Sequence, residues 1–348
     1  MAAKFTLPHL GITFSHRSLF LIVVIVSTWG RASWADNNSS PCDSWMSIPV
    51  PVTDQPTLAD MQSLRGCDSE ALYYGIGINA DPSKARLCAF YQIETAKEKS
   101  DLPAFEGAGI LMMIYANGKS TVRNIALARR FACSIWSAPA ELEGRLEHLS
   151  HIEKTKDSPT DFDVCDDITS GIMTGECSAH EERVAAARRR AALSGAIAKL
   201  NTVQRAVLSE VEQSLELFIT ARSQGEIDLG GTIAPARLIT AESAVREQYA
   251  ETLSKLLSGQ EMSASAKKSL AAERELNSIY KRLLTQKEFH AEGVSAEGIK
   301  ATQRSWLKYR DAWVKFGKII DLKWSTESLM TDLTVQRVAM LKERIVEQ

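Results

Sequence analysis

The sequence predicts an all-α protein, with helical hairpins in its first half and a helical bundle in its second half. Apolar residues recur at spacings of three and four beyond residue 67, as expected for helices that bury one face. All cysteines precede residue 178, which marks a boundary between the two halves. A length of 348 residues, with 45% hydrophobic, is enough to bury an extensive core in two or three domains.

The first 35 residues have the pattern of a secretory signal peptide. Basic residues precede a short apolar run, 19–27, and the small residues Ser33 and Ala35 suit a cleavage site after Ala35. The run is too short to span a bilayer comfortably, so a retained anchor is the weaker alternative. The pattern predicts a periplasmic or secreted protein with no membrane span after cleavage.

Charge and motifs exclude several classes of function. Removing the leader takes away Lys4, Arg17 and Arg31 but no acid, and the mildly acidic remainder argues against a nucleic-acid partner. The histidines are few and scattered, and the sequence has no HExxH pair, nucleophile elbow or phosphate-binding glycine loop. We therefore expect neither an enzyme nor a metal site nor a cofactor.

An even number of cysteines in an exported chain predicts disulfides. Free thiols or a metal site are the alternative, but no Cys-x-x-Cys pair supports a zinc cage. We predict a Cys88–Cys133 bond between the second helices of two similar hairpins and a Cys165–Cys177 bond across a short loop, which leaves Cys42 for Cys67. The disulfide cysteines are Cys42, Cys67, Cys88, Cys133, Cys165 and Cys177.

The segment 36–66 is rich in Pro, Ser and Asn and is expected to be extended, without a core of its own. Two similar units follow, each with a helix that ends in glycine, a short turn and a second helix built on Ala and aromatic residues. Gly75, Gly77 and Gly118 suit helix C-caps and tight turns, and Asp81 before Pro82 suits an N-cap.

These two units resemble Sel-one-like repeats, which are relatives of tetratricopeptide hairpins. The resemblance implies a disulfide-stapled repeat domain over 67–177 with a concave surface for protein contact. The alternative is a helical cap without a binding role. The acid-rich stretch that follows the hairpins is expected to be a solvated loop held by Cys165 and Cys177.

The region 178–260 is predicted to be helical. Helices are expected over 181–200 and 237–257, with an aliphatic helix between them, a Gly- and Pro-rich interruption at 225–235 and an end at Gly259. The motif Gln204-Arg-Ala-Val-Leu lies 99 positions before Gln303-Arg-Ser-Trp-Leu, so this region is a possible degenerate copy of the one that follows.

The segment 265–346 is predicted to contain three helices. The apolar positions of its middle helix step by three and four, as do those of the helices on either side. Trp306 and Tyr309 are expected in the core, Arg310 to cover the Trp306 ring or pair with an acid, and Asp311 to pair with a neighbouring lysine. The motif residues are Leu276, Asn277, Tyr280, Gln303, Arg304, Trp306, Leu307, Tyr309, Arg310 and Asp311.

This motif resembles the N-terminal domain of LprI-type lysozyme inhibitors. The resemblance implies an exported bacterial envelope protein that binds a lysozyme-type muramidase and blocks its cleavage of peptidoglycan. We predict partner contacts through Lys287 and His290 in a polar loop and through Arg304 and Arg310 on the middle helix. The alternative function is a periplasmic adaptor or assembly factor that binds through its helical repeats. The sequence leaves the true partner and the oligomeric state open.

Overall fold

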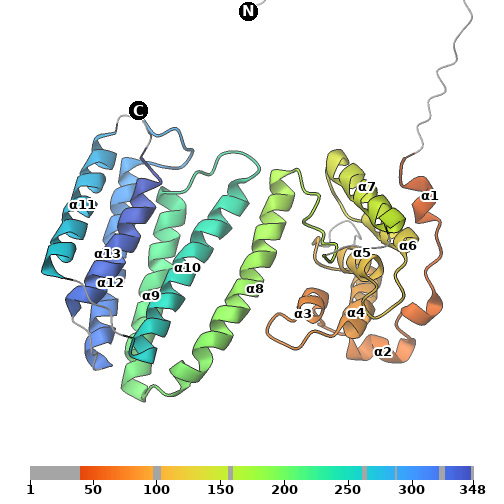
Figure 1. Cartoon of the computed structure of the whole chain (residues 1–348), viewed down its shortest axis with the longest axis horizontal. Coiled ribbons are helices and arrows are strands. Elements are labelled where there is room, and N and C mark those ends of the chain that lie inside the picture. Colours follow the sequence, from red (N-terminus) through yellow and green to blue (C-terminus); the bar gives the residue numbers. More distant parts are fainter. Residues whose placement is uncertain are drawn as a thin grey trace, which may run out of the picture. The chain divides into compact units, whose positions relative to one another are not determined.

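The computed structural model describes residues 40–96, 103–155, 160–260, 265–286, 288–320 and 326–345. The described residues form helices joined by turns and loops, without a strand (Figure 1), which confirms the predicted all-α class. None of the helices in these ranges is both long enough and apolar enough to cross a bilayer. The predicted leader, 1–35, and Lys287 lie outside the described residues.

The first part of the described chain contains short helices and two hairpins. The segment expected to be extended holds three of these short elements: α1 (Asp43–Met46), η1 (Val52–Asp54) and α2 (Leu58–Ser63), none of which contributes a buried residue. The first hairpin pairs α3 (Ser69–Tyr74) with α4 (Pro82–Thr95), and the second pairs α5 (Ala108–Asn117) with α6 (Ile125–Ala132). The helix α7 (Pro139–Thr155) follows.

The two hairpins have the same turn chemistry at positions 43 residues apart. Gly75 ends α3 and Gly118 ends α5, both with a left-handed backbone (φ of 75° and 68°), which confirms the predicted caps. Asp81 and Asn124 cap the second helices, and their backbone N–H groups donate to Leu72 and Tyr115 at 2.7 and 2.9 Å. This internal repetition supports the Sel-one-like interpretation, which stays a prediction.

The disulfide pairing differs from the prediction in two of its three bonds. Cys165–Cys177 is confirmed, but Cys42 bonds Cys133 and Cys67 bonds Cys88. The Sγ atoms of Cys88 and Cys133 do not meet because Cys88 faces back towards the start of its own hairpin. Cys133 instead anchors α1 to the end of α6, where Arg130 also donates to the backbone carbonyl of Ile48 at 2.9 Å.

The acid-rich loop at 160–168 packs on the hairpin turns, and it is not simply a solvated loop. The Asn117 side chain exchanges two 2.8 Å hydrogen bonds with the Phe162 backbone, and Tyr74 donates to Asp163 at 2.5 Å. Phe162 and Val164 are fully buried as a result. The loop therefore covers the C-terminal ends of α3 and α5.

Six long helices form the second part of the described chain. The first set comprises α8 (Gly171–Ala198), α9 (Thr202–Gly225) and α10 (Ala234–Ser258), and the second set comprises α11 (Ala266–Thr285), α12 (Ala296–Ile319) and α13 (Thr326–Lys342). The helix α8 starts ten residues before the predicted 181 and crosses the expected boundary at Cys177. Its Met173 and Cys177 lie in the core of the hairpins, and its Leu193 lies in the core of the bundle.

Each set has the same arrangement of helix directions. The first and third helices run parallel. Gly175 near the start of α8 lies beside Pro235 near the start of α10, and further along both helices Arg189 pairs with Glu247 at 3.2 Å. In the second set, α11 and α13 are likewise parallel, because Ser269 bonds Thr331 and Glu275 pairs with Lys342 further along. The two middle helices, α9 and α12, pack antiparallel at the centre of the bundle.

A pair of glycines lets these two central helices approach closely. A Cβ on Gly225 would come within 2.6 Å of the Gly298 backbone, and the reverse substitution would do the same. The helix α9 begins at Thr202 and α12 at Ala296, so they are offset by 94 positions and not by the 99 of the motif comparison. The matching directions support a duplication of three helices, which stays a proposal.

Candidate functional site

The middle helix of the second set, α12, separates its residues cleanly into a buried and an exposed face. Trp306, Tyr309, Trp313 and Phe316 are at most 4% exposed, and they pack with Phe218 and Tyr249 of the first set. This confirms that the apolar stripe is core. Gln303, a motif residue one turn before Trp306, is also buried, and its amide oxygen accepts a 3.0 Å bond from Arg337 Nε.

Arg310 makes both contacts that the sequence suggested as alternatives. Its guanidinium lies 5.0 Å from the centre of the Trp306 ring and its Nη1 donates to Glu273 Oε1 of α11 at 3.0 Å. Thr334 of α13 donates to the same carboxylate oxygen at 3.3 Å. Arg310 therefore joins all three helices of the set, and its side chain is occupied within the fold.

A buried ion pair that the sequence analysis did not find holds α13 to α9. The guanidinium of Arg337 donates to both carboxylate oxygens of Glu226 at 2.8 and 2.5 Å, and neither residue is more than 1% exposed. Arg337 also lies over the Phe218 ring. Such a bidentate pair fixes the angle between the two helices.

The outward face of α12 carries more basic than acidic side chains, with Glu297 and Asp311 as the exposed acids. Lys300, Arg304 and Lys308 are spaced four apart, so they follow one line along the helix surface, with Lys315 and Lys318 further on. Lys300 pairs with Glu297 at 3.6 Å and Lys315 with Glu210 of α9 at 2.6 Å, not with Asp311. Among the described residues, Arg304 and Lys308 make no ion pair. We call Lys300, Arg304 and Lys308 the basic row.

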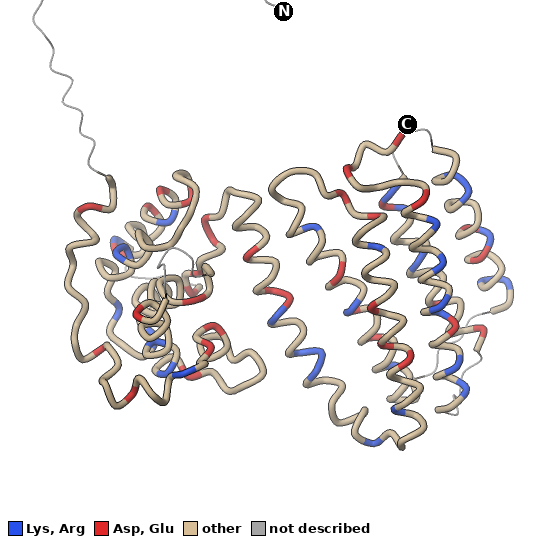
Figure 2. The backbone as a smooth tube through the Cα atoms, turned by 180° about the vertical axis from the view of Figure 1, so that it is seen from behind, with Lys and Arg blue, Asp and Glu red and all other residues tan. Residues whose placement is uncertain are grey.

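The basic row belongs to a bundle whose helices carry Lys and Arg as well as Asp and Glu along their length (Figure 2). Arg304 and Arg310, which were both predicted to contact the partner, lie on different sides of α12. A helix turns by about 100° per residue, so Arg304 and Arg310 lie about 120° apart around the axis. Arg304 is exposed on the outer side, whereas Arg310 faces α11.

The polar loop before α12 is anchored to the loop between α9 and α10. Glu292 accepts from the Leu229 N–H at 2.8 Å, and its own N–H donates to Asp228 at 3.0 Å. The Gly230 N–H, together with the Glu292 N–H and the charge of Arg237, lowers the pKa of Asp228. Within this loop His290 is exposed. A cavity of about 620 Å³ adjoins the loop at Ala291 and is lined by Arg222, Arg237 and Arg344.

The described ranges hold no group of three His, Cys, Asp or Glu side chains that is close enough to bind a metal ion. The two histidines of α7 differ from each other: His151 is exposed, whereas His148 is half-buried and bonds Asp167 at 3.1 Å, so it is not a plain surface residue. Residues 188–190 of α8 are three consecutive arginines. Arg189 is buried and pairs with Glu182 and Glu247, whereas Arg188 and Arg190 are exposed.

Residues 258–341 match the family described as lysozyme inhibitor LprI. The matched segment contains α11, α12 and all but the last residue of α13, and with them the basic row and the contacts of Arg310. No curated protein and no solved structure matches the chain. The match likens this set of helices to a family that is named for lysozyme inhibition. The disulfides agree with an oxidising compartment outside the cytoplasm.

Proposed function

We propose that the exported chain binds a lysozyme-type muramidase and blocks its cleft, and that the basic row of α12 is the centre of the contact. The match of residues 258–341 to the lysozyme inhibitor family carries this proposal. The basic row lies within that segment, on the outward side of a helix whose opposite side is firmly packed. A rigid helix can present such side chains at low entropic cost.

The spacing of the basic row suits the chemistry of the target. Glycosidases of this kind use two carboxyl groups, which lie about 5–9.5 Å apart. Residues four apart on a helix are separated by about 6 Å along its axis. Two neighbouring cations of the row can therefore each donate a charge-assisted hydrogen bond to one carboxyl group. His290, in the loop that precedes α12, would contact the rim of the same cleft, as would Lys287.

A turbidity assay tests the proposal and separates it from the alternatives. Peptidoglycan is mixed with a muramidase, with and without the purified mature chain, and clearing of the suspension is followed. We expect protection that rises with dose and saturates. Unchanged clearing, together with capture of another envelope protein on the hairpins, would favour the adaptor. Clearing without added muramidase would show a hydrolase and contradict our proposal.

Charge reversal locates the contact. We expect the triple variant Lys300→Glu/Arg304→Glu/Lys308→Glu to lose inhibition by at least a hundredfold in the half-inhibitory concentration, because two desolvated ion pairs become repulsive. The matched control is Lys84→Glu/Arg188→Glu/Lys199→Glu, which makes the same charge change at exposed sites outside the matched segment. Equal loss in both triples would show a general charge effect and remove the site assignment.

A further inference from the structure

The first set of helices contains an open groove where the second set is filled. In the second set, Arg310 and Glu273 close the space between α11 and α12 above α13. In the first set, the corresponding space between α8 and α9, above α10, is a cavity of about 500 Å³. Small residues line it at Ala186, Ser194 and Ala250, which leaves space between the larger side chains of its walls.

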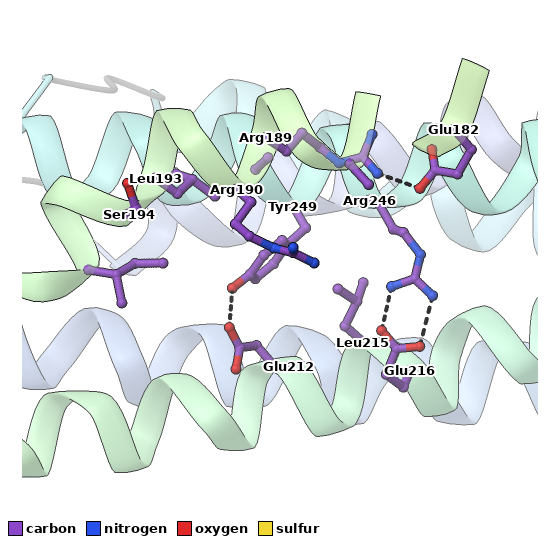
Figure 3. A pocket seen from close by; sticks show the side chains of 13 residues that line it. Glu182, Arg189, Arg190, Leu193, Ser194, Glu212, Leu215, Glu216, Arg246 and Tyr249 are labelled. Carbon is purple, nitrogen blue, oxygen red and sulfur yellow. Dashed lines mark hydrogen bonds and ion pairs between the residues drawn. The ribbon is translucent and has the colours of Figure 1, made fainter. Parts of the chain in front are cut away.

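The floor and one end of the groove are apolar. Leu193 and Leu215 are buried beneath it, Ile197 lies at the end nearest the α8–α9 turn, and the Tyr249 ring forms part of the wall (Figure 3). From Arg190 to Ile197, α8 rises by about 10 Å at about 1.5 Å per residue. That distance is the length of an extended aliphatic chain of roughly eight to ten carbon atoms.

Among the described residues, two charged side chains that line the groove make no ion pair, Arg190 and Glu212. Arg246 donates to both oxygens of Glu216 at 2.5 and 2.9 Å, and Tyr249 donates to Glu212 at 2.9 Å. Arg189 pairs with Glu182 and Glu247. Arg190 extends over the groove beside Tyr249 (Figure 3), and among the described residues it makes no ion pair. The groove thus offers one free guanidinium above an apolar floor.

We propose that this groove binds an amphipathic carboxylate, a medium-chain fatty acid of roughly eight to ten carbons. The carboxylate pairs with Arg190, and the chain lies over Leu193 and Leu215 towards Ile197. A volume of about 500 Å³ falls within the usual range for small-ligand pockets. An ammonium head in the same position would be repelled by Arg190. The site is separate from the basic row, so this proposal stands independently of muramidase binding.

Calorimetric titration of the full chain with sodium decanoate tests the site. We expect one saturable site with a dissociation constant on the order of 0.1 mM. Affinity is expected to fall about two- to fourfold for each methylene removed between decanoate and hexanoate, because each one buries apolar surface. Decanol and decylammonium should bind at least tenfold more weakly. Equal binding of decanoate and decylammonium, or no saturation by decanoate, would overturn the proposal.

Three variants locate the bound molecule. Arg190→Gln should weaken decanoate binding at least tenfold, and Ser194→Phe should abolish it by filling the groove from an exposed position. Arg188→Gln is the matched control, since Arg188 is exposed on the same helix but outside this groove, and it should bind as the wild type does. Circular dichroism checks that all three keep their helix content. Unchanged binding by both Arg190→Gln and Ser194→Phe would contradict the assignment.

Discussion

Arginines show at the residue scale how the same side chain serves structure at one position and remains available at another. Arg310 and Arg337 are both committed to carboxylates inside the bundle, at Glu273 and Glu226. Arg304 is exposed, about 120° away from Arg310 around the axis of α12. The motif contains Arg304 and Arg310 together, so it includes both an exposed arginine, which we propose for partner contact, and one that is committed to the fold.

Replacing Arg310 by alanine should destabilise the protein by about 1–2 kcal/mol. The variant loses the bond to Glu273, the contact with the Trp306 ring and the packing of the aliphatic stem. Urea denaturation measures the difference. Arg304→Ala is the control and should change stability by less than about 0.5 kcal/mol, because that side chain is exposed. An equal effect of both variants would contradict the division of roles.

Replacing Arg337 by methionine should cost about 3–5 kcal/mol, because buried Glu226 would lose its bidentate partner and keep only Arg222, whose Nε lies 4.0 Å from it. The double variant Arg337→Met/Glu226→Met removes both charges and should be more stable than Arg337→Met alone. The same denaturation experiment compares the two. If the double variant is the less stable one, the two residues do not act as a pair.

At the element scale, α8 joins the hairpins to the bundle through a clamp around Glu70 of α3. His180 bonds this carboxylate at 2.6 Å and Arg183 pairs with it at 2.7 Å, while the His180 ring stacks on Phe105. Burial alone would raise the pKa of Glu70, but the bonds from His180 and Arg183 outweigh it and lower that pKa below 4.5. The clamp is therefore complete only when Glu70 is ionised.

The clamp predicts a pH dependence with a definite sign. Because the folded pKa of Glu70 is lowered, its stabilisation is present above pH 4.5 and is lost as the pH falls through the folded value. The melting temperature of Glu70→Gln should therefore fall less than that of the wild type when the pH is lowered from neutral into this range. Thermal melts at several pH values measure this, and parallel curves for the two proteins would contradict it.

The disulfides test the placement of the first elements. The Cys42–Cys133 bond closes a loop of 91 residues, and the Cys165–Cys177 bond closes one of 12. Replacing both cysteines of the first bond by serine should therefore lower the free energy of unfolding by about 1–2 kcal/mol more than the same change at the second bond. The reason is that a longer closed loop restricts the unfolded chain more. Peptide mapping of the unreduced protein by mass spectrometry checks the pairing directly. A Cys88–Cys133 peptide would contradict the fold of the hairpins described above.

Local signals allowed the sequence to predict single elements well. The glycine caps at Gly75 and Gly118, the end at Gly259 and the buried stripe of α12 depend only on nearby residues. Contacts between residues that are distant in the sequence could not be predicted from such local signals. Cys42 meets Cys133, Arg310 meets Glu273 and Arg337 meets Glu226 only after the helices have packed. The early start of α8 did have a local signal, the N-cap at Ser170.

At the scale of the whole molecule, the described chain combines a disulfide-bonded hairpin region with two sets of three helices. The loop at 160–168 covers the ends of α3 and α5, whereas Arg304 and Lys308 are exposed on the outer face of α12. The groove lies in the first set of helices and the basic row in the second, so the two sets carry different candidate sites. The candidate site was found from the sequence in part: Arg304 was named, but its partners Lys300 and Lys308 in the row were not.

Lysine footprinting in the presence of a muramidase tests the central claim most directly. The free chain and its mixture with the enzyme are acetylated briefly, and labelling of each lysine is measured by mass spectrometry. We predict that Lys300 and Lys308 become protected in the mixture, while the exposed Lys84 and Lys199 are labelled equally in both samples. Unchanged labelling of Lys300 and Lys308, or protection confined to Lys84, would contradict the assignment of the basic row as the binding surface.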